Sequence, residues 1–114
     1  MAIKIVTDST CDLDKKTAQD LSIEIVPLNV HFGDEVYKDG IEINSDNFFD
    51  KLINGSIYPK TSQPSVGEFI DVYEKLGNDG SDIVSIHISD QLSGTINSAR
   101  QAAKHLEGKV KVHI

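Results

Sequence analysis

Short apolar runs alternate along the chain with segments of helical periodicity. Four of the runs are typical of strands, and they cover residues 3–6, 23–28, 83–88 and 109–114. Apolar side chains at three- and four-residue spacing predict helices over residues 13–21, 65–76 and 95–106. Because strands that alternate with helices are joined by βαβ crossovers, the pattern predicts a mostly parallel sheet in a layered α/β fold.

Turn and capping residues refine the first part of this pattern. Asp12 is expected to cap the first helix, because a carboxylate accepts hydrogen bonds from the free N–H groups of a helix start. Pro27 cannot donate a ladder hydrogen bond and therefore places the second strand at an edge of the sheet. Alternation around Gly33-Asp34 predicts a small surface hairpin within residues 29–40.

The middle of the chain is predicted to be helical and then irregular. A helix is expected to begin at Asn44 or Ser45 and to end near residue 53. An irregular stretch over residues 56–64 follows it. The segment Ser65-Val66-Gly67-Glu68 fits a capping box, in which Ser65 begins the next helix.

Charge and cysteine content narrow the function classes. The chain of 114 residues has 11 Lys and Arg against 18 Asp and Glu, which gives a net charge of −7 and a pI near 4.9. Such an acidic domain does not attract phosphate backbones, and its one arginine, Arg100, leaves no basic patch for nucleic acid or a membrane surface. One cysteine, Cys11, excludes an internal disulfide and a zinc cluster of thiolates, so the reducing cytoplasm is the expected compartment.

Length and the two ends of the chain add further expectations. No apolar run approaches the ~20 residues that a membrane span needs, so stable membrane insertion is not expected. Met1 leads directly into a strand-like run, which is unlike a signal peptide. The length is that of one small domain, yet the last residues still alternate as a strand does. A piece of a longer protein is therefore expected.

Three segments rich in hydroxyl groups are candidates for a binding site. They are Thr7-Asp8-Ser9-Thr10, Thr61-Ser62-Gln63-Pro64-Ser65, and residues 89–95. The first and third follow predicted strands, and the second precedes a helix. Because ligands of open parallel sheets bind outside the carboxyl ends of the strands, we expect the three segments to meet on one rim of the sheet.

Within the third segment, Leu92-Ser93-Gly94-Thr95 stands at the start of a predicted helix. A helix N-terminus offers free N–H groups and partial positive charge, Gly94 permits close approach to the backbone, and Ser93 and Thr95 add hydroxyl donors. These features predict a site for a carboxylate or phosphate that needs no cation. The alternative is that Ser93 only caps the helix.

The second segment offers two hydroxyl groups that capping does not use. Ser65 serves as the cap, so Thr61 and Ser62 are available for another role, and Pro64 stiffens the loop. A solvated turn is the alternative interpretation of Thr61 and Ser62.

Other polar residues have simpler interpretations. Asp8 fits local turn hydrogen bonds better than a metal site, because no cluster of His, Asp and Glu at ligand spacing accompanies it. His87 fits a buried, hydrogen-bonded histidine, and Cys11 a small packed residue. Glycine-rich nucleotide motifs and hydrolase motifs are absent, so no metal, cofactor or catalytic residue is predicted.

The motifs taken together resemble the DegV family in order and spacing. The matching segments run through essentially the whole chain, and the specific ones are the combination of T-S-Q-P-S at 61–65 and L-S-G-T at 92–95. The others are I-V-T-D-S-T-C-D-L at 5–13, V-P-L at 26–28, Y-K-D-G at 37–40 and I-H-I-S at 86–89.

The resemblance implies a fold and a function. It implies a three-layer αβα domain with a mostly parallel sheet, in which residues 1–114 form the N-terminal domain of a two-domain, bacterial, cytoplasmic protein whose C-terminal domain is absent from this chain. DegV-like proteins bind one long-chain fatty acid between their two domains. FakB-type members present that acid to a separate ATP-dependent fatty acid kinase, which makes the acyl phosphate, and are not themselves enzymes.

Carried onto this chain, the resemblance assigns the fatty-acid carboxylate to hydroxyl groups on the expected rim. The matched residues are Thr61 and Ser93, together with Gly94 through its backbone, and Ser62 and Thr95 in secondary positions. Much of the acyl tunnel belongs to the C-terminal domain, so we expect the fragment alone to bind fatty acid weakly or not at all. The alternative function is a small phosphotransferase or hydrolase subunit that binds a phosphorylated metabolite at the same rim. A regulatory module that senses a ligand is a third.

Overall fold

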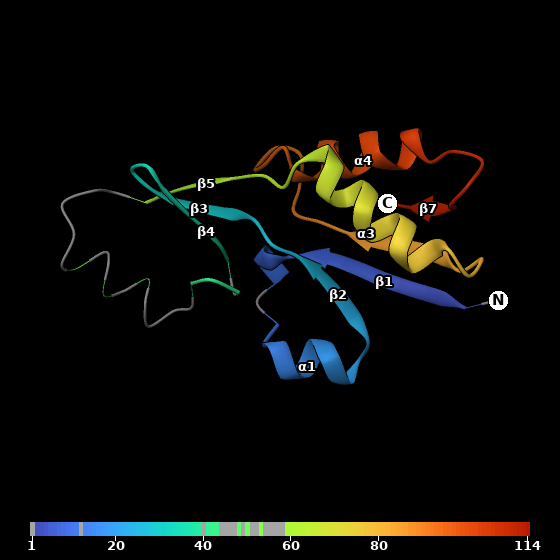
Figure 1. Ribbon diagram of the computed structural model, residues 1–114, viewed down its shortest axis with the longest axis horizontal. Coiled ribbons are helices and arrows are strands. Elements are labelled where there is room, and N and C mark those ends of the chain that lie inside the picture. The colour runs from blue at the N-terminus through green and yellow to red at the C-terminus, as the bar shows by residue number, and fades with distance from the viewer. Residues whose placement is uncertain are drawn as a thin grey trace.

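A parallel sheet of four strands forms the body of the domain (Figure 1). The computed structural model describes residues 2–11, 13–39, 41–43, 48, 50, 53 and 59–114. The sheet has the order β2-β1-β6-β7. Its strands are β1 (Ile3–Asp8), β2 (Ile23–Val26), β6 (Asp82–Ile86) and β7 (Val112–His113). In the register of the sheet, Ile5 lies between Ile23 and Val84, so the carboxyl ends of β1, β2 and β6 share one edge.

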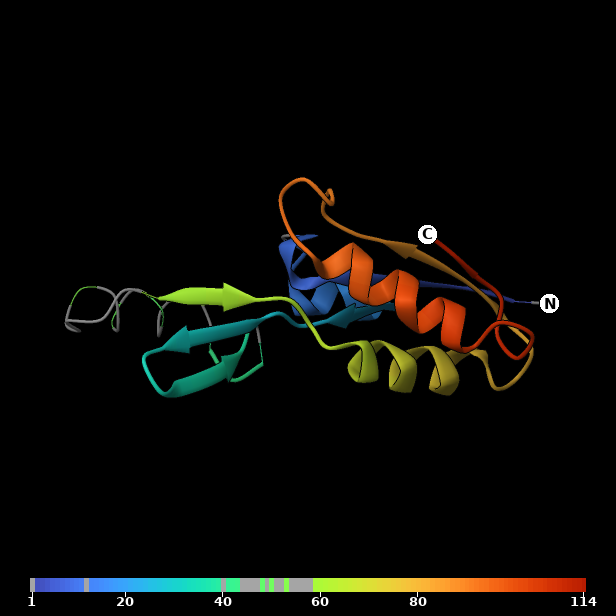
Figure 2. The same cartoon turned by 90° about the horizontal axis from the view of Figure 1, so that it is seen from above.

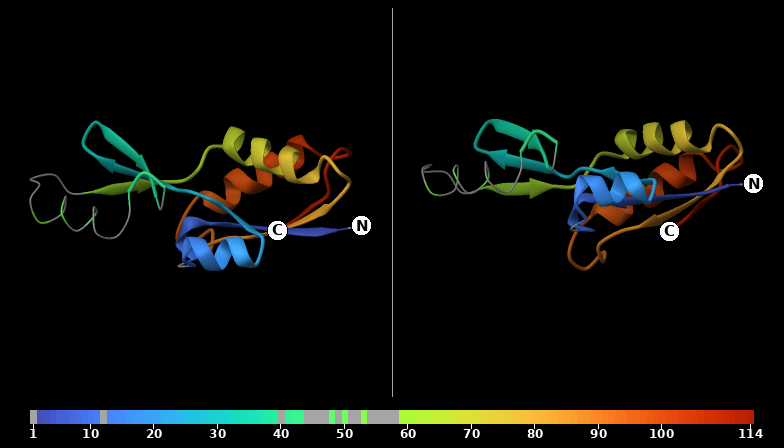
Figure 3. Two further views of the ribbon diagram at one scale, coloured as in Figure 1. Left: turned by 60° about the horizontal axis from the view of Figure 1, so that its bottom comes forward. Right: turned by 90° about the horizontal axis from the view of Figure 1, so that it is seen from below.

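Helices cover both faces of this sheet, so the predicted three-layer α/β architecture is confirmed. Helix α1 (Lys15–Asp20) lies on one face, and α3 (Val66–Gly77) and α4 (Thr95–His105) lie side by side on the other (Figures 1 and 3). The placement follows from the right-handed crossover rule, because the chain moves across the sheet in opposite directions through α1 and α4.

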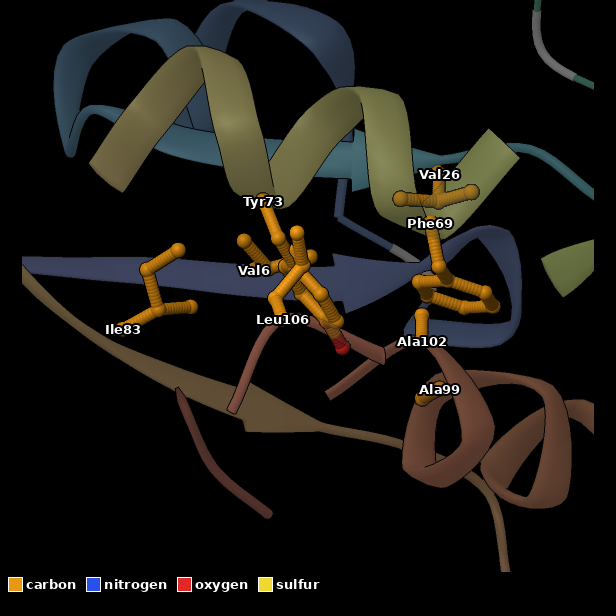
Figure 4. Packing of buried hydrophobic residues seen from close by; sticks show 8 residues of the cluster. All are labelled: Val6, Val26, Phe69, Tyr73, Ile83, Ala99, Ala102 and Leu106. Atoms are coloured by element: carbon orange, nitrogen blue, oxygen red, sulfur yellow. The ribbon is translucent and has the colours of Figure 1, made fainter. Parts of the chain in front are cut away.

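The main core lies between the sheet and the α3–α4 layer (Figure 4). Phe69 and Tyr73 of α3 are fully buried against Val6 of β1 and Ile83 of β6. The remaining buried members of this cluster are Val26, Ala99, Ala102 and Leu106. Small side chains on α4 allow the two helices to pack closely over the sheet. The face with α1 is covered less completely, since Ile3 remains 69% exposed.

A second, antiparallel sheet extends from the carboxyl-end edge of the first (Figure 2). Strands β3 (Asn29–Phe32) and β4 (Glu35–Lys38) form the predicted hairpin, in which Gly33 adopts a positive φ of 63°. Strand β5 (Lys60–Ser62) pairs with the other edge of β3. Val30, Phe32 and Ile43 form a small separate core here.

The prediction of an irregular stretch over residues 56–64 is wrong for residues 60–62, which form strand β5. The segment gains regular structure by antiparallel pairing with a strand about thirty residues earlier, and no local pattern announces such a pairing. The predicted helix with its cap at Asn44 or Ser45 lies largely outside the described residues, as do residues 54–58.

The helix boundaries bring further corrections. The first helix begins two residues later than predicted, because Asp14 is its cap and its Oδ1 accepts from the backbone N–H of Thr17 at 2.6 Å. Asp12, the expected cap, lies outside the described residues. Ser65 caps α3 as predicted, with Oγ accepting from the N–H of Glu68 at 3.1 Å. The carboxylate of Glu68 binds Lys38 at 2.9 Å, so only half of the capping box forms.

The ends of all four predicted strands of the parallel sheet also differ from the prediction, and β2 ends at Val26 rather than at residue 28. Strand β1 continues through Asp8, and β6 ends at Ile86. The last predicted strand, 109–114, shortens to Val112–His113, because the N–H groups of Lys109 and Val110 bond the carbonyl of Leu106 and prolong the turn after α4. In the described part of the chain, no helix has the length and apolar character needed to cross a membrane.

Candidate functional site

Contacts link parts of the three hydroxyl-rich segments near the carboxyl-end edge of the parallel sheet. The end of β1 contacts the end of β6, where Thr7 Oγ1 donates to the carbonyl of Ile86 at 2.8 Å. In the second segment, Nε2 of Gln63 donates to Oγ of Ser98 at 2.9 Å, on the helix α4 that begins at the end of the third segment. Gln63 of the second segment also packs against Gly94 of the third. The first segment is joined to Ile86 and Ile88, just before the third segment, so the predicted meeting is observed only for these parts.

The start of α4 carries two hydroxyl groups that touch each other. Oγ of Ser93 lies 2.9 Å from Oγ1 of Thr95 and accepts from the backbone N–H of Thr95 at 3.2 Å. Gly94 is the N-cap and has no side chain to bond the N–H groups of the first turn. Ser93 therefore lies one residue before the cap position. It satisfies one N–H group, and its partly buried hydroxyl remains beside the helix start.

Gln63 packs against Gly94, so a side chain at this position would have to displace the end of Gln63. A β-carbon on Gly94 would lie 2.8 Å from Cδ of Gln63 and would overlap its Oε1. The predicted role of this glycine was to let a ligand approach the backbone. In this structure the side of Gly94 where a side chain would stand is filled by Gln63, so its absent side chain serves packing between the second and third segments.

Thr61 and Ser62 face different directions, because adjacent residues of a strand point to opposite faces. Thr61 is opposite Val30 in the ladder between β5 and β3 and is exposed. Ser62 is half-buried, and its Oγ lies 2.8 Å from Nε2 of His31. The two hydroxyls therefore do not form a single pair, and no hydrogen bond among the described residues joins Thr61 to Ser93.

A buried polar chain runs beneath the rim, and the sequence predicted only its separate parts. Nδ1 of His87 lies 2.9 Å from Oδ2 of Asp8, with the two side chains 0% and 1% exposed. Nε2 of His87 lies 2.5 Å from Oγ of Ser85, which lies 2.7 Å from the hydroxyl of Tyr73. The prediction that His87 is a buried, hydrogen-bonded histidine is confirmed.

The carboxylate of Asp8 is held in its ionised form. Burial by itself raises the pKa of Asp8, but hydrogen bonds from His87 and Thr10 outweigh it and lower the pKa to about 2. The local turn bonds predicted for Asp8 are present, since Oδ1 accepts from the N–H of Thr10 at 2.9 Å and from its hydroxyl. At the other end of this row of hydrogen-bonded side chains, burial raises the pKa of Tyr73 to about 12, although the hydrogen bond with Ser85 lowers it somewhat.

Sequence reasoning missed Gln63, Ser98 and Tyr73 as contributors to this region. The spacing of Ser85 and His87 was a usable signal, because residues two apart on a strand share a face. Nothing local pointed to Gln63, whose partners lie on another element. The part of the chain that the structure describes contains no group of three or more His, Cys, Asp or Glu side chains placed to hold a metal ion.

The fold and the rim define a class: an α/β protein whose hydroxyl-lined strand ends and helix start are suited to an anionic group. The model for the DegV family, described as an uncharacterised protein, matches residues 2–114, and the chain belongs to the DegV family. A DegV domain-containing protein of Halalkalibacterium halodurans is 45% identical over 107 residues, which cover 93% of this chain and 38% of that protein.

Solved structures agree with this assignment. The stearic acid-binding protein of Eubacterium ventriosum is 36% identical and superposes with a TM-score of 0.91, over 99% of this chain and 40% of that one. DegV of Bacillus subtilis, a fatty acid binding protein, is 35% identical with a TM-score of 0.93 at the same two shares. The chain thus spans about 40% of the length of the proteins it matches.

Proposed function

We propose that this chain is the N-terminal domain of a fatty-acid-binding protein and that it holds the carboxylate of a long-chain fatty acid. Thr61 and Ser93 donate hydrogen bonds to the carboxylate oxygens, with the backbone of Gly94 and the hydroxyls of Ser62 and Thr95 in supporting positions. The observation that carries this assignment is the contact of the Ser93 and Thr95 hydroxyls at 2.9 Å beside the start of α4.

The physical basis is local and does not depend on the net charge of −7. A carboxylate accepts hydrogen bonds from hydroxyl and N–H donors, and bonds to an ionised acceptor contribute ~1.5–3 kcal/mol each. The start of α4 adds the positive end of the helix dipole. The acyl chain gains about 0.8 kcal/mol for each buried CH₂, which supports a site completed by the part of the protein beyond these residues.

A finer part of the proposal concerns what the bound acid is for. We propose that the protein is a cytoplasmic carrier that presents the carboxylate to a separate fatty acid kinase and performs no chemistry itself. The resemblance of the T-S-Q-P-S and L-S-G-T motifs to carrier proteins of this kind supports the assignment. The test is to mix the loaded protein with ATP and a recombinant fatty acid kinase and to trap acyl phosphate as its hydroxamate. No hydroxamate above the kinase-only control would refute the carrier role.

The binding test uses the intact protein, meaning the whole polypeptide to which this chain belongs. Solvent extracts of the purified protein are analysed by mass spectrometry, and palmitic acid is titrated into the delipidated form. We expect one fatty acid per protein and at least a tenfold weaker affinity in Ser93→Ala and in Thr61→Ala. The matched control is Ser65→Ala, which removes a helix cap in the same region without removing a proposed ligand. Equal affinity in all four proteins would overturn the site assignment.

A further inference from the structure

The side chains of Asp8 and His87 bridge two strand ends that are far apart in sequence. Oδ2 of Asp8 accepts from His87 Nδ1 at 2.9 Å and from the backbone N–H of Ile88 at 3.4 Å, while Oδ1 is held by Thr10. One carboxylate thus fixes the turn after β1 and the first two residues after β6.

The ring of His87 is held from every side. Asp8 is ionised and can only accept, so Nδ1 carries a proton, and in the neutral ring Nε2 accepts from the hydroxyl of Ser85. Ser85 is joined in turn to Tyr73 on α3. Phe69 packs edge-to-face against the imidazole on its remaining side, with the two ring centroids 5.2 Å apart. The imidazole therefore has one orientation.

His87 also begins the segment that ends at the candidate anion site. The carbonyl of Ser89 accepts from the N–H groups of Leu92 and Ser93 at 3.0 and 3.1 Å, so a tight turn connects the fixed residues 87–88 to Ser93. A short, hydrogen-bonded segment thus connects His87 to Ser93.

A buried pair of this kind has a consequence other than stability. Replacing both members of a buried charged pair with apolar side chains of similar volume is often neutral or stabilising, whereas removing one member alone is strongly destabilising. Apolar side chains make no directional contacts. Hydrogen bonds to Asp8, by contrast, orient the imidazole of His87 and the N–H of Ile88.

We propose that Asp8 and His87 are positioning residues for the carboxylate site: they hold residues 87–93 in the conformation that aims the Ser93 hydroxyl at the ligand, and they do not touch the ligand themselves. This inference rests on the proposed function of Ser93. It adds the requirement that the affinity for the fatty-acid carboxylate depends on the buried pair of Asp8 and His87.

The experiment compares Asp8→Asn, His87→Gln and His87→Leu with the unchanged intact protein, and Ser65→Ala is the control for lost stability. Palmitic acid carrying ¹³C at the carboxyl carbon is the probe. Its affinity is measured by titration, and its carboxyl chemical shift reports the hydrogen bonds at the ligand. Asp8→Asn and His87→Leu should each weaken binding at least tenfold and move the shift toward that of the free acid.

His87→Gln distinguishes positioning from general structural damage. The glutamine amide can still donate to Asp8, so this variant should recover a substantial part of the affinity that His87→Leu loses. Ser65→Ala should lower the melting temperature and leave affinity and chemical shift unchanged. Equal losses in His87→Gln and His87→Leu, or an unchanged shift in Asp8→Asn, would overturn the inference. If Asp8→Asn does not fold, the two His87 variants decide the question.

Amide hydrogen exchange separates failure of this inference from failure of the proposed function. In ligand-free protein, Asp8→Asn should speed exchange at Ile88, Leu92 and Ser93, while the amides in the middle of α3 stay protected. If the unchanged protein binds no palmitic acid but this local loss of protection occurs, the carboxylate function fails and the positioning of the loop stands. Unchanged exchange at these amides would refute the positioning role directly.

Discussion

The side chain of Gln63 lies over the α-carbon of Gly94 and donates from Nε2 to Oγ of Ser98, one turn further along α4. Gln63 comes from the segment between β5 and α3, so this contact joins the two segments that carry the proposed ligand hydroxyls. Its geometry leads to a prediction about two substitutions made together.

Gly94→Ala should destabilise the intact protein, because the new methyl group displaces Gln63 and breaks its bond to Ser98. The expected cost is ~0.5–1.5 kcal/mol for the lost hydrogen bond, with a further ~0.5–1 kcal/mol because alanine is a much poorer N-cap than glycine. In a Gln63→Ala background the same substitution should cost clearly less. Urea unfolding of the four proteins gives the coupling energy, and additive effects would contradict the contact.

The stability of the protein should fall in acid through Asp8. Its folded-state pKa of about 2 lies below the ordinary value of 3.8, so its contribution is complete above pH 4 and is lost as the pH falls toward 2. A shift of this size corresponds to about 2 kcal/mol. Hydrogen bonds from Ser81 and Lys4 also lower the pKa of Asp79, which therefore adds to the acid sensitivity.

Comparison with Asp8→Asn isolates this contribution. The variant should be less stable than the unchanged protein at pH 7, and the gap should narrow by about 2 kcal/mol on going to pH 2. The free energy of unfolding is measured by urea titration at each pH. A gap that stays constant between pH 7 and pH 2 would show that Asp8 is not held ionised by its partners.

Removing the hydroxyl of Tyr73 should loosen the far end of the buried chain while its ring still fills the core. Tyr73→Phe leaves Ser85 with His87 as a partner, so we expect a loss of ~1 kcal/mol, the usual net contribution of one hydrogen bond. Thermal unfolding measures it. Phe69→Ala, which empties part of the same core, should cost ~3–5 kcal/mol and serves as the scale for a packing defect.

Ser65→Ala should cost about 1 kcal/mol, because Ser65 Oγ accepts from the N–H of Glu68 at the start of α3. The ion pair between Glu68 and Lys38 remains in this variant. Helix content by circular dichroism and the urea midpoint are the measurements. A variant as stable as the unchanged protein would mean that water replaces the cap without cost.

Local sequence patterns predicted the layered α/β fold because each of its elements has a signal of its own. The apolar stripe of α3 and the Ser65 cap lie within one short segment, and so do the two strands of the hairpin. Strand β5 has no such signal, since its structure depends on pairing with β3. The first helix shows a different difficulty: Asp12 and Asp14 are both suitable caps, and the choice between them depends on where the chain leaves the sheet.

The candidate site likewise contains residues with a local sequence signal and residues without one. Ser93, Gly94 and Thr95 were predicted from their place before a helix, which is a local property. The pair of Asp8 and His87 was not predicted, because 79 residues separate its members and only the adjacency of β1 and β6 brings them together. The packing of Gln63 on Gly94 likewise depends on the fold as a whole.

The division of the domain into two sheets bears on the energetics of any shared ligand. The chain passes between the sheets twice, at Leu28–Asn29 and at residues 63–65, and Thr61 stands on the smaller sheet while Ser93 belongs to the larger. A carboxylate that accepts hydrogen bonds from both hydroxyls would connect the smaller sheet to the larger one. Its binding free energy would then also stabilise the arrangement of the smaller sheet against the larger one, so acids that bind more tightly should stabilise both sheets more.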